Sequence, residues 1–257
     1  MTPVLSTFER WAVEAVTRPS LTVVIPAYNE FGRIVPTIAT VAAHISSSYG
    51  TDWELIVADD GSTDGTAEVV HRLGLVNVRV LSSDVNVGKG DAVRRGLRAA
   101  RGLHVLFADA DQSTPVEQFG TLLCRTLEGA DIVIAPRAVD GATAEGRTLV
   151  RRLVSGIGRA VVRRGLGLRF ADTQCGFKLY TARAARLVAE QQVETGFAFD
   201  LEQLFLAERL GLVVEEVGVE WIDAPGSKVR AGRETLRFLA AILRIRVRAL
   251  VGVYRRG

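Results

Sequence analysis

Short apolar runs alternate with helix-like segments through the first half of this 257-residue chain. The apolar runs, each of a length typical of a buried strand, are Leu21–Ile25, Trp53–Ala58, Val78–Leu81, Leu103–Ala108 and Asp131–Ala135. The segments expected to form helices between them are Arg33–Ile45, Thr66–Leu73, Asp91–Ala100 and Val116–Leu127. Strand–helix alternation is typical of a mainly parallel sheet with helices on both faces. The sequence therefore predicts an α/β fold whose ligands bind beyond the carboxyl ends of the strands.

Polar clusters follow four of these strands. The clusters are PAYNE (Pro26–Glu30), DDGSTDGT (Asp59–Thr66), NVGKG (Asn86–Gly90) and DAD (Asp109–Asp111). Because the carboxyl ends of parallel strands meet at one edge of a sheet, the four clusters are expected to converge there. Carboxylates, glycines and a lysine gathered at one edge indicate a binding site.

The DAD cluster carries the strongest chemical signal. Alternation along an extended segment would place the carboxylates of Asp109 and Asp111 on the same side of the chain. A divalent cation such as Mg²⁺ or Mn²⁺ prefers such oxygen ligands, one or two carboxylates being completed by substrate phosphates. The alternative is a loop with an aspartate N-cap before the helix expected at Val116. The convergence of the other clusters favours a site for a metal ion and a phosphate.

Two further side chains are candidates for the same site. Asp59 stands directly at a strand end and is a candidate acceptor for a nucleobase N–H, whereas Asp64 and Thr66 are typical of helix caps. The glycines of NVGKG permit close backbone approach, and Lys89 between them is a candidate ligand for a phosphate or a sugar. The alternative for NVGKG is an ordinary turn at a helix N-terminus, since the sequence contains neither a P-loop nor GxGxxG after a strand.

Bulk properties exclude several other classes. Hydrophobic residues make up 48% of the chain and charged residues 24%, which suits a folded globular protein. Two cysteines, Cys124 and Cys175, make neither a disulfide framework nor a zinc pattern, so a reducing compartment is expected. Charges interrupt residues 1–20, so no signal peptide is expected, and no apolar run reaches the length of a membrane span. These features favour a cytoplasmic protein.

The C-terminal region is strongly basic. Residues 228–257 carry nine Lys or Arg side chains and one acid, Glu234, a net charge of +8; since the whole chain carries +3, the remainder carries −5. An arginine-rich amphipathic helix is attracted to an anionic membrane surface. Its apolar stripe consists of Leu236, Leu239, Leu243 and Val247. A core helix or a dimer helix is the alternative, and nucleic acid is not favoured because aromatics are scarce and no binding motif occurs.

Four motifs in a fixed order resemble the family 2 glycosyltransferases with the GT-A fold. They are VVIPAYNE, VADDGSTDGT, NVGKGDAVRRG and FADAD. The later segments DTQCGFKLY (Asp172–Tyr180), GFAFDLE (Gly196–Glu202), Trp221 to Lys228 and RIRVRALVGVYR resemble the dolichyl-phosphate β-glucosyltransferases and their prokaryotic polyprenyl-phosphate relatives. The resemblance runs from about Leu21 to the C-terminus.

The resemblance implies a reaction and its partners. An inverting enzyme of this kind moves glucose from UDP-glucose, with Mg²⁺ or Mn²⁺, to a polyprenyl phosphate of the dolichyl type. A GDP-mannose-dependent enzyme, transfer to a soluble acceptor, and a sugar-nucleotide-binding regulator without turnover are the alternatives. Intact Asp109 and Asp111 argue against the regulator.

The resemblance also implies roles for particular residues. The nucleotide-sugar pocket would be formed by Pro26, Tyr28, Glu30, Asp59, Asp60, Lys89, Asp109 and Ala110. The cation would be held by Asp109 and Asp111, while a glutamine that assists the metal in related mannose synthases corresponds to Ser113, with Gln112 one residue early. The acceptor phosphate would be bound by Arg137, Arg151 and Ser155. The sugar and acceptor pocket would include Asp172, Gln174, Gly176, Lys178 and Asp200. For Asp200, a helix N-cap before Leu201 is an equal alternative.

Three regions are expected along the chain. These are an N-terminal segment over 1–20, a GT-A catalytic domain over 21–229 with a mixed, mainly parallel sheet, and an amphipathic membrane-surface helix over 230–257. Within the second region, residues 147–168 are expected to form a basic amphipathic helix and Val213–Val219 a strand. The eukaryotic relatives carry an N-terminal membrane anchor, whereas this chain begins with a short polar-apolar segment. We therefore expect a peripheral protein on the cytoplasmic face of a membrane, and a homo-oligomer stays open.

Overall fold

A seven-stranded sheet forms the centre of the molecule in the computed structural model, which describes residues 5–136, 162–170, 172–219 and 231–254, the last without the side chains of 231–237. The strands are β1 (Leu21–Ala27), β2 (Trp53–Asp59), β3 (Val78–Leu81), β4 (His104–Ala108), β5 (Ile132–Ile134), β6 (Phe177–Thr181) and β7 (Val214–Glu216). Their order across the sheet is β3-β2-β1-β4-β6-β5-β7. All recorded pairings are parallel except those of β6 with β4 and β5. The predicted mixed, mainly parallel sheet is therefore confirmed.

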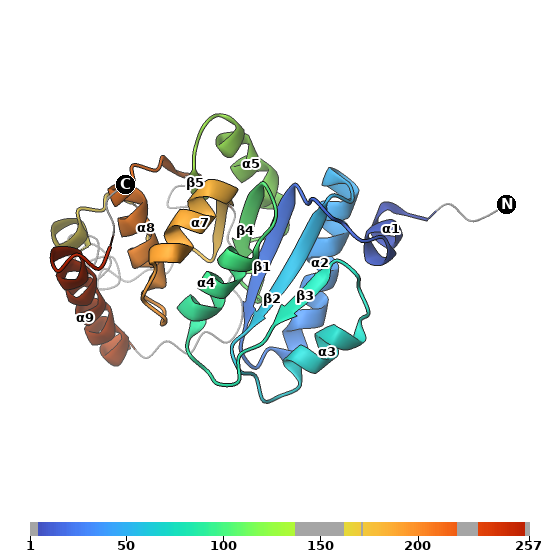
Figure 1. Ribbon diagram of the computed structural model, residues 1–257, viewed down its shortest axis with the longest axis horizontal. Helices are drawn as coiled ribbons and strands as arrows, with labels where there is room; N and C mark the ends of the chain where they lie inside the picture. The colour runs from blue at the N-terminus through green and yellow to red at the C-terminus, as the bar shows by residue number, and fades with distance from the viewer. Residues whose placement is uncertain (1–4, 137–161, 171, 220–230, 255–257) are drawn as a thin grey trace, which may run out of the picture.

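Helices cover both faces of the sheet (Figure 1). They are α1 (Thr7–Val13), α2 (Phe31–Tyr49), α3 (Thr66–Arg72), α4 (Lys89–Ala99), the 3₁₀ turn η1 (Val116–Gln118), α5 (Phe119–Leu127), α7 (Ala182–Gln191), α8 (Phe199–Arg209) and α9 (Ala231–Leu250). Successive strand residues such as Val23 and Val24 enter opposite cores, one beneath α2 and α5 and the other beneath α4, α7 and α8. Burial on both faces explains why the central strands β1, β2 and β4 are mostly apolar.

Three elements lie where the sequence pattern predicts no strand or helix, namely α1, β6 and α7. Strand β6 runs antiparallel between β4 and β5, and the charged Lys178 interrupts its apolar pattern although that residue is only 1% exposed. The strand expected over Val213–Val219 pairs only as β7. The helix expected from Val116 begins with the 3₁₀ turn η1. These positions and boundaries depend on contacts between residues distant in sequence, so local periodicity does not predict them.

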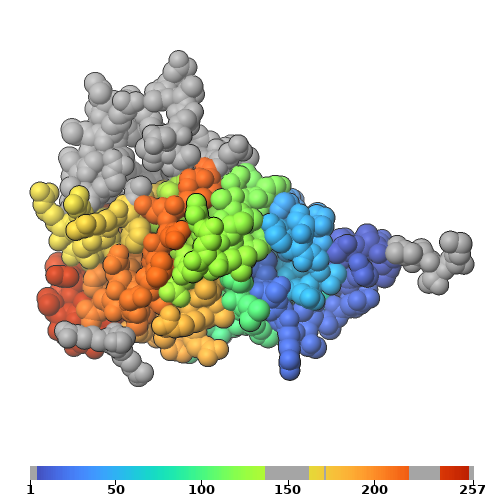
Figure 2. Space-filling model, turned by 90° about the horizontal axis from the view of Figure 1, so that it is seen from above, coloured from blue at the N-terminus to red at the C-terminus, as the bar shows by residue number. Residues whose placement is uncertain are grey.

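Both terminal helices pack against the sheet domain, at opposite ends of the molecule (Figures 1 and 2). Trp11 of α1 is fully buried, its ring stacks on that of Trp53 with centroids 4.1 Å apart, and its indole N–H donates to the Trp53 carbonyl at 2.7 Å. Helix α9 inserts Ala241, Ile242 and Ile245 into the domain. None of the helices in the described part of the chain is both long and apolar enough to cross a membrane.

Candidate functional site

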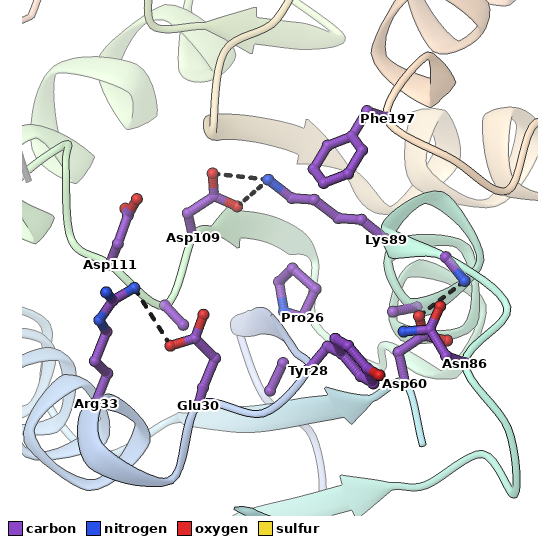
Figure 3. A pocket seen from close by; sticks show the side chains of 14 residues that line it. Pro26, Tyr28, Glu30, Arg33, Asp60, Asn86, Lys89, Asp109, Asp111 and Phe197 are labelled. Atoms are coloured by element: carbon purple, nitrogen blue, oxygen red, sulfur yellow. Dashed lines mark hydrogen bonds and ion pairs between the residues drawn. The ribbon is translucent and has the colours of Figure 1, made fainter. Parts of the chain in front are cut away.

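The polar clusters converge on a cavity of about 410 Å³ at the carboxyl edge of the sheet. The segments after β1, β2, β3 and β4 all contribute to its wall, as the sequence predicts for strand ends in a parallel sheet. Its lining residues are Pro26, Ala27, Tyr28, Glu30, Arg33, Asp60, Asn86, Gly88, Lys89, Ala92, Asp109, Ala110, Asp111 and Phe197. Figure 3 shows the carboxylates of Asp109, Asp111 and Glu30 on one side of this cavity and the Lys89 side chain reaching toward them.

Lys89 and Asp109 form an ion pair across the cavity. The Lys89 ammonium lies 2.7 Å from Oδ1 and 2.8 Å from Oδ2 of Asp109 (Figure 3). The ammonium also lies 5.6 Å from the ring centroid of Phe107 and 6.0 Å from that of Phe197. Burial opposes its charge, but Asp109 and Asp200 outweigh burial and raise the pKa of Lys89. The ammonium is therefore charged at neutral pH.

The wall of the cavity that faces Lys89 carries an excess of negative charge. Burial raises the pKa of Glu30 above its ordinary value, and the charges of Asp111, Asp64 and Asp109 add to the rise. Arg33, whose Nη1 lies 3.5 Å from Glu30 Oε2, opposes it. Carboxylates that repel one another around a cavity favour the arrival of a cation.

The DAD cluster forms a turn rather than the extended segment that the sequence predicts. Strand β4 ends at Ala108, and the amide of Gln112, whose φ is +52°, donates to the Asp109 carbonyl at 3.3 Å. The Asp109 amide still donates to the Gly176 carbonyl and the chain turns after it, yet both Asp109 and Asp111 line the cavity. Asp111 Oδ1 accepts the amide of Ser113 at 3.0 Å. The Gln112 side chain donates to Thr37 Oγ1 at 3.1 Å, and Gln112 is not among the lining residues.

These residues fit a divalent cation that is completed by substrate. Asp109 already attracts a cationic group, and exposed Asp111 stands two residues away on the same rim. Within the described ranges, no group of three or more His, Cys, Asp or Glu side chains would hold a metal ion alone. A cation bound to Asp109 and Asp111 would therefore take its other ligands from phosphate oxygens and water.

Gly176 makes the room that Asp109 occupies. The Gly176 carbonyl accepts the Asp109 amide at 3.0 Å. A Cβ at position 176 would lie 2.2 Å from Asp109 Oδ2, which real contacts do not allow. Asp172 and Gln174 lie in the same loop, where the Gln174 amide donates to Asp172 Oδ1 at 3.0 Å, and neither lines the cavity. The motif DTQCGFK thus supports the position of the first aspartate.

The NVGKG segment is fixed by protein contacts. The Asp60 carboxylate accepts the amides of Val87 at 3.0 Å and Gly88 at 2.8 Å. A Cβ on Gly88 would lie 2.4 Å from the Thr195 carbonyl oxygen. The close approach that these glycines permit is therefore to the segment that carries Phe197. It positions Lys89 at the start of α4.

Asp59 lies beneath the cavity wall and is not among its lining residues. It is 2% exposed, and its Oδ2 accepts the Ser62 amide at 3.3 Å. Its Oδ1 is buried with no hydrogen-bond partner among the described residues. The role predicted for Asp59 as a nucleobase acceptor stays a prediction, and this unpaired oxygen is the feature compatible with it.

Lys178 and Asp200 form a buried ion pair behind Lys89. The side chain of Lys178 is 1% exposed and that of Asp200 9%, and Lys178 Nζ donates to Asp200 Oδ1. The rings of Phe107 and Phe199 flank the Lys178 ammonium, with centroids 5.9 Å and 5.4 Å away. Asp200 is not the helix N-cap that we considered, because Ala198 occupies that position of α8. Neither residue lines the cavity.

Helix α9 forms ion pairs with Glu194, which lies in the segment that packs against NVGKG. Arg244 donates to both carboxylate oxygens of Glu194 at 2.9 Å, and Arg248 donates to Oε1 at 2.6 Å. Glu194 is 5% exposed. Burial alone would raise its pKa, but the two guanidinium groups outweigh burial and lower the pKa below its ordinary value. Two of the arginines counted as lipid-facing are therefore paired within the protein.

The predicted site residues and the residues that line the cavity overlap only in part. The acceptor-phosphate residues Arg137, Arg151 and Ser155 lie outside the described residues. Arg33, Asn86 and Phe197 line the cavity although no role was predicted for them. Asn86 stands in a motif already singled out, and Phe197 stands in GFAFDLE, so position within the motifs was the available signal.

Comparison with known proteins identifies the family of this chain. A sequence model described as glycosyl transferase family 2 matches residues 22–188. A dolichyl-phosphate β-glucosyltransferase of Saccharomyces cerevisiae is 32% identical over 256 residues, covering 91% of this chain and 76% of the relative. The enzyme of the same description from Drosophila melanogaster is 35% identical over 266 residues, covering 95% and 82%.

A solved structure shows the same fold. It is glucosyl-3-phosphoglycerate synthase from Mycobacterium tuberculosis in complex with Mn²⁺, UDP-glucose and phosphoglyceric acid. The TM-score is 0.61 at 25% identity, with 96% of this chain and 84% of that chain covered.

Proposed function

This chain belongs to glycosyltransferase family 2 and has the GT-A fold, and from that premise we propose that it moves glucose from UDP-glucose to a polyprenyl phosphate of the dolichyl type with inversion. The observation that carries the proposal is the cavity at the sheet edge, with Asp109 and Asp111 on one rim and Lys89 reaching across it. The relatives described as dolichyl-phosphate β-glucosyltransferases support the hexose and the acceptor. The similar structure in complex with UDP-glucose and Mn²⁺ supports the donor and the ion.

The acceptor makes the chemistry simple. A phosphate monoester has a second pKa of about 6, so it arrives largely as a dianion near neutrality and needs no strong catalytic base. The protein must align this nucleophile with the sugar and offset the repulsion between two phosphorylated substrates. Direct displacement at the α-linked carbon then gives a β-linked product.

The residues of the cavity divide this work. When a divalent cation is bound, it neutralises charge that develops on the leaving diphosphate. Asp109 and Asp111 would hold that cation on one rim, and Lys89 offers a second positive group on the other. Gly176 and Asp60 keep Asp109 and the Lys89 segment in place. Arg137, Arg151 and Ser155 are proposed for the acceptor phosphate.

A donor and acceptor assay tests the proposal. The protein is incubated with Mg²⁺, a short polyprenyl phosphate and either UDP-glucose or GDP-mannose. The glycolipid is then extracted and identified by mass spectrometry. We expect a glucolipid from UDP-glucose. A product from GDP-mannose alone would replace the hexose assignment, and no glycolipid from either donor would contradict the proposal. Phosphoglycerate serves as a soluble-acceptor arm, because the similar structure binds phosphoglyceric acid.

The outward face of α9 is proposed to contact the membrane that holds the lipid acceptor. Leu239, Leu243 and Val247 are 42%, 66% and 47% exposed, whereas Ala241, Ile242 and Ile245 pack into the domain. Exposed Arg246 adds positive charge beside this stripe. An apolar face with a basic flank is typical of helices that lie in a lipid interface. The proposed location is the cytoplasmic face.

Charges placed on this stripe are expected to weaken vesicle binding. In the double variant Leu243→Asp/Val247→Asp, we expect about tenfold weaker co-sedimentation with vesicles containing anionic lipid, because the buried apolar area is lost and like charges repel. Leu127→Asp is the matched control, since Leu127 is 72% exposed on α5 and lies outside α9. Equal binding of the double variant and the wild type would contradict the membrane role of α9.

A further inference from the structure

The Lys89 ammonium occupies the place that a cation would need at Asp109. It contacts both carboxylate oxygens, at 2.7 Å and 2.8 Å. A hard divalent cation seeks the same two oxygens at a distance of about 2.0–2.2 Å. Two cationic groups cannot share one carboxylate at these distances without strong repulsion. Lys89 and a metal ion therefore compete for Asp109.

The position of Lys89 is built into the fold. It is the first residue of α4, and its neighbour Gly88 is held both by the Asp60 carboxylate and by tight packing against Thr195. Its ammonium lies near the rings of Phe107 and Phe197, and its side chain remains 26% exposed. The backbone is fixed, whereas the long side chain keeps rotational freedom at its polar end.

Asp111, unlike Asp109, has no ion pair with Lys89 among the described residues. It stands on the same rim, but its recorded hydrogen bond is to the Ser113 amide, and its side chain is exposed. A cation arriving alone would meet Asp111 ready to bind and Asp109 already neutralised. Asp111 by itself is a single carboxylate, which gives weak metal binding.

We propose that Lys89 is the resident counter-cation of Asp109, and that a divalent cation gains this carboxylate when the diphosphate of the nucleotide sugar draws the ammonium away. The inference rests on the proposed function, since it assumes a cation and a nucleotide diphosphate in this cavity. The diphosphate gives Lys89 a new anionic partner, and the metal gives Asp109 a new cationic partner. Metal and nucleotide then bind with positive coupling, each tightening the other equally.

Manganese titrations of Lys89→Met test the proposal without turnover. Free Mn²⁺ is followed by its electron paramagnetic resonance signal, with and without UDP. Without UDP, we expect Lys89→Met to bind Mn²⁺ about tenfold more tightly than the wild type, because no ammonium has to be displaced. With UDP, the affinity gain should be large in the wild type and several-fold smaller in the variant.

Arg33→Met is the matched control. Arg33 lines the same cavity and carries the same charge, but its ion pair is with Glu30 at 3.5 Å. We expect it to tighten Mn²⁺ binding by about twofold or less, as for an exposed pair. Equal gains in Arg33→Met and Lys89→Met would show that cavity charge alone matters and would overturn the proposal. So would a Lys89→Met protein that binds Mn²⁺ no more tightly than the wild type.

Asp109→Asn separates this inference from the proposed function. If Asp109→Asn loses UDP-dependent Mn²⁺ binding while Lys89→Met gains nothing, the metal site stands and the competition is wrong. If no variant and no wild-type protein binds Mn²⁺ at saturating UDP, the metal part of the proposed function fails as well. Thermal unfolding of each variant confirms that the compared proteins are folded.

Discussion

Alanine at position 111 is expected to lower glucosyl transfer by at least about 10²–10³-fold while leaving the protein folded. Asp111 is the rim carboxylate that has no ion pair recorded among the described residues, so the cation would depend on it directly. Its exposed side chain accepts one backbone hydrogen bond, from Ser113. Removing that bond should change the free energy of unfolding by about 1 kcal/mol or less. The measurements are the initial rate of glycolipid formation and thermal unfolding.

The control for Asp111 is another exposed aspartate. Asp84 lies between β3 and α4, and it is not among the residues that line the cavity. Asp84→Ala removes the same charge from the molecule, so its rate should stay within about twofold of the wild type. An Asp111→Ala protein with the wild-type rate would remove Asp111 from the proposed metal site.

The sheet and the convergence of strand ends were predictable because each rests on local signals. Mainly apolar runs such as Trp53–Ala58 identify strands buried on both faces, and parallel strands deliver their ends to one edge. The predicted clusters accordingly line one cavity. Glycines were also correctly seen as points of close approach, although Gly88 approaches Thr195 rather than a ligand.

What could not be predicted depends on partners distant in sequence. Strand β6 was missed because Lys178 breaks the apolar pattern, and its partner Asp200 lies 22 residues further along. The arginines of α9 suggested a lipid surface, yet Arg244 and Arg248 pair with Glu194, which lies 50 and 54 residues away. The sequence does not show whether a charged side chain faces solvent or pairs with a buried carboxylate. Only the fold decides between them.

Charges of alternating sign extend from the cavity into the core. Asp109 is paired with Lys89, Asp200 raises the pKa of Lys89, and Lys178 is paired with Asp200. The inner pair does not reach the cavity, but it sets the field that Lys89 experiences. The motif residues Lys178 and Asp200 are therefore best explained as support for the site, through charge and packing.

Breaking the inner pair is expected to cost about 3–5 kcal/mol of stability. In Lys178→Met, the Asp200 carboxylate stays buried without its cation, whereas the double variant Lys178→Met/Asp200→Leu removes both charges. We expect the double variant to regain most of the loss, because two apolar side chains replace two buried ions. Chemical denaturation measures both. If the double variant is as unstable as the single one, lost packing rather than an unpaired charge is the cause.

The pH dependence of Lys178→Met provides a second, independent check. Burial raises the pKa of Asp200 above 3.8 even beside Lys178, and removing that ammonium must raise it further. A carboxyl group with a raised pKa in the folded state binds more protons there than in the unfolded state. Stability therefore falls as pH rises from the ordinary aspartate value through the raised one. The deficit of Lys178→Met relative to the wild type should be smaller at about pH 4 than at about pH 7. A deficit independent of pH would mean that Asp200 finds another cation when Lys178 is gone, and Lys89 is the nearest candidate by its charge coupling.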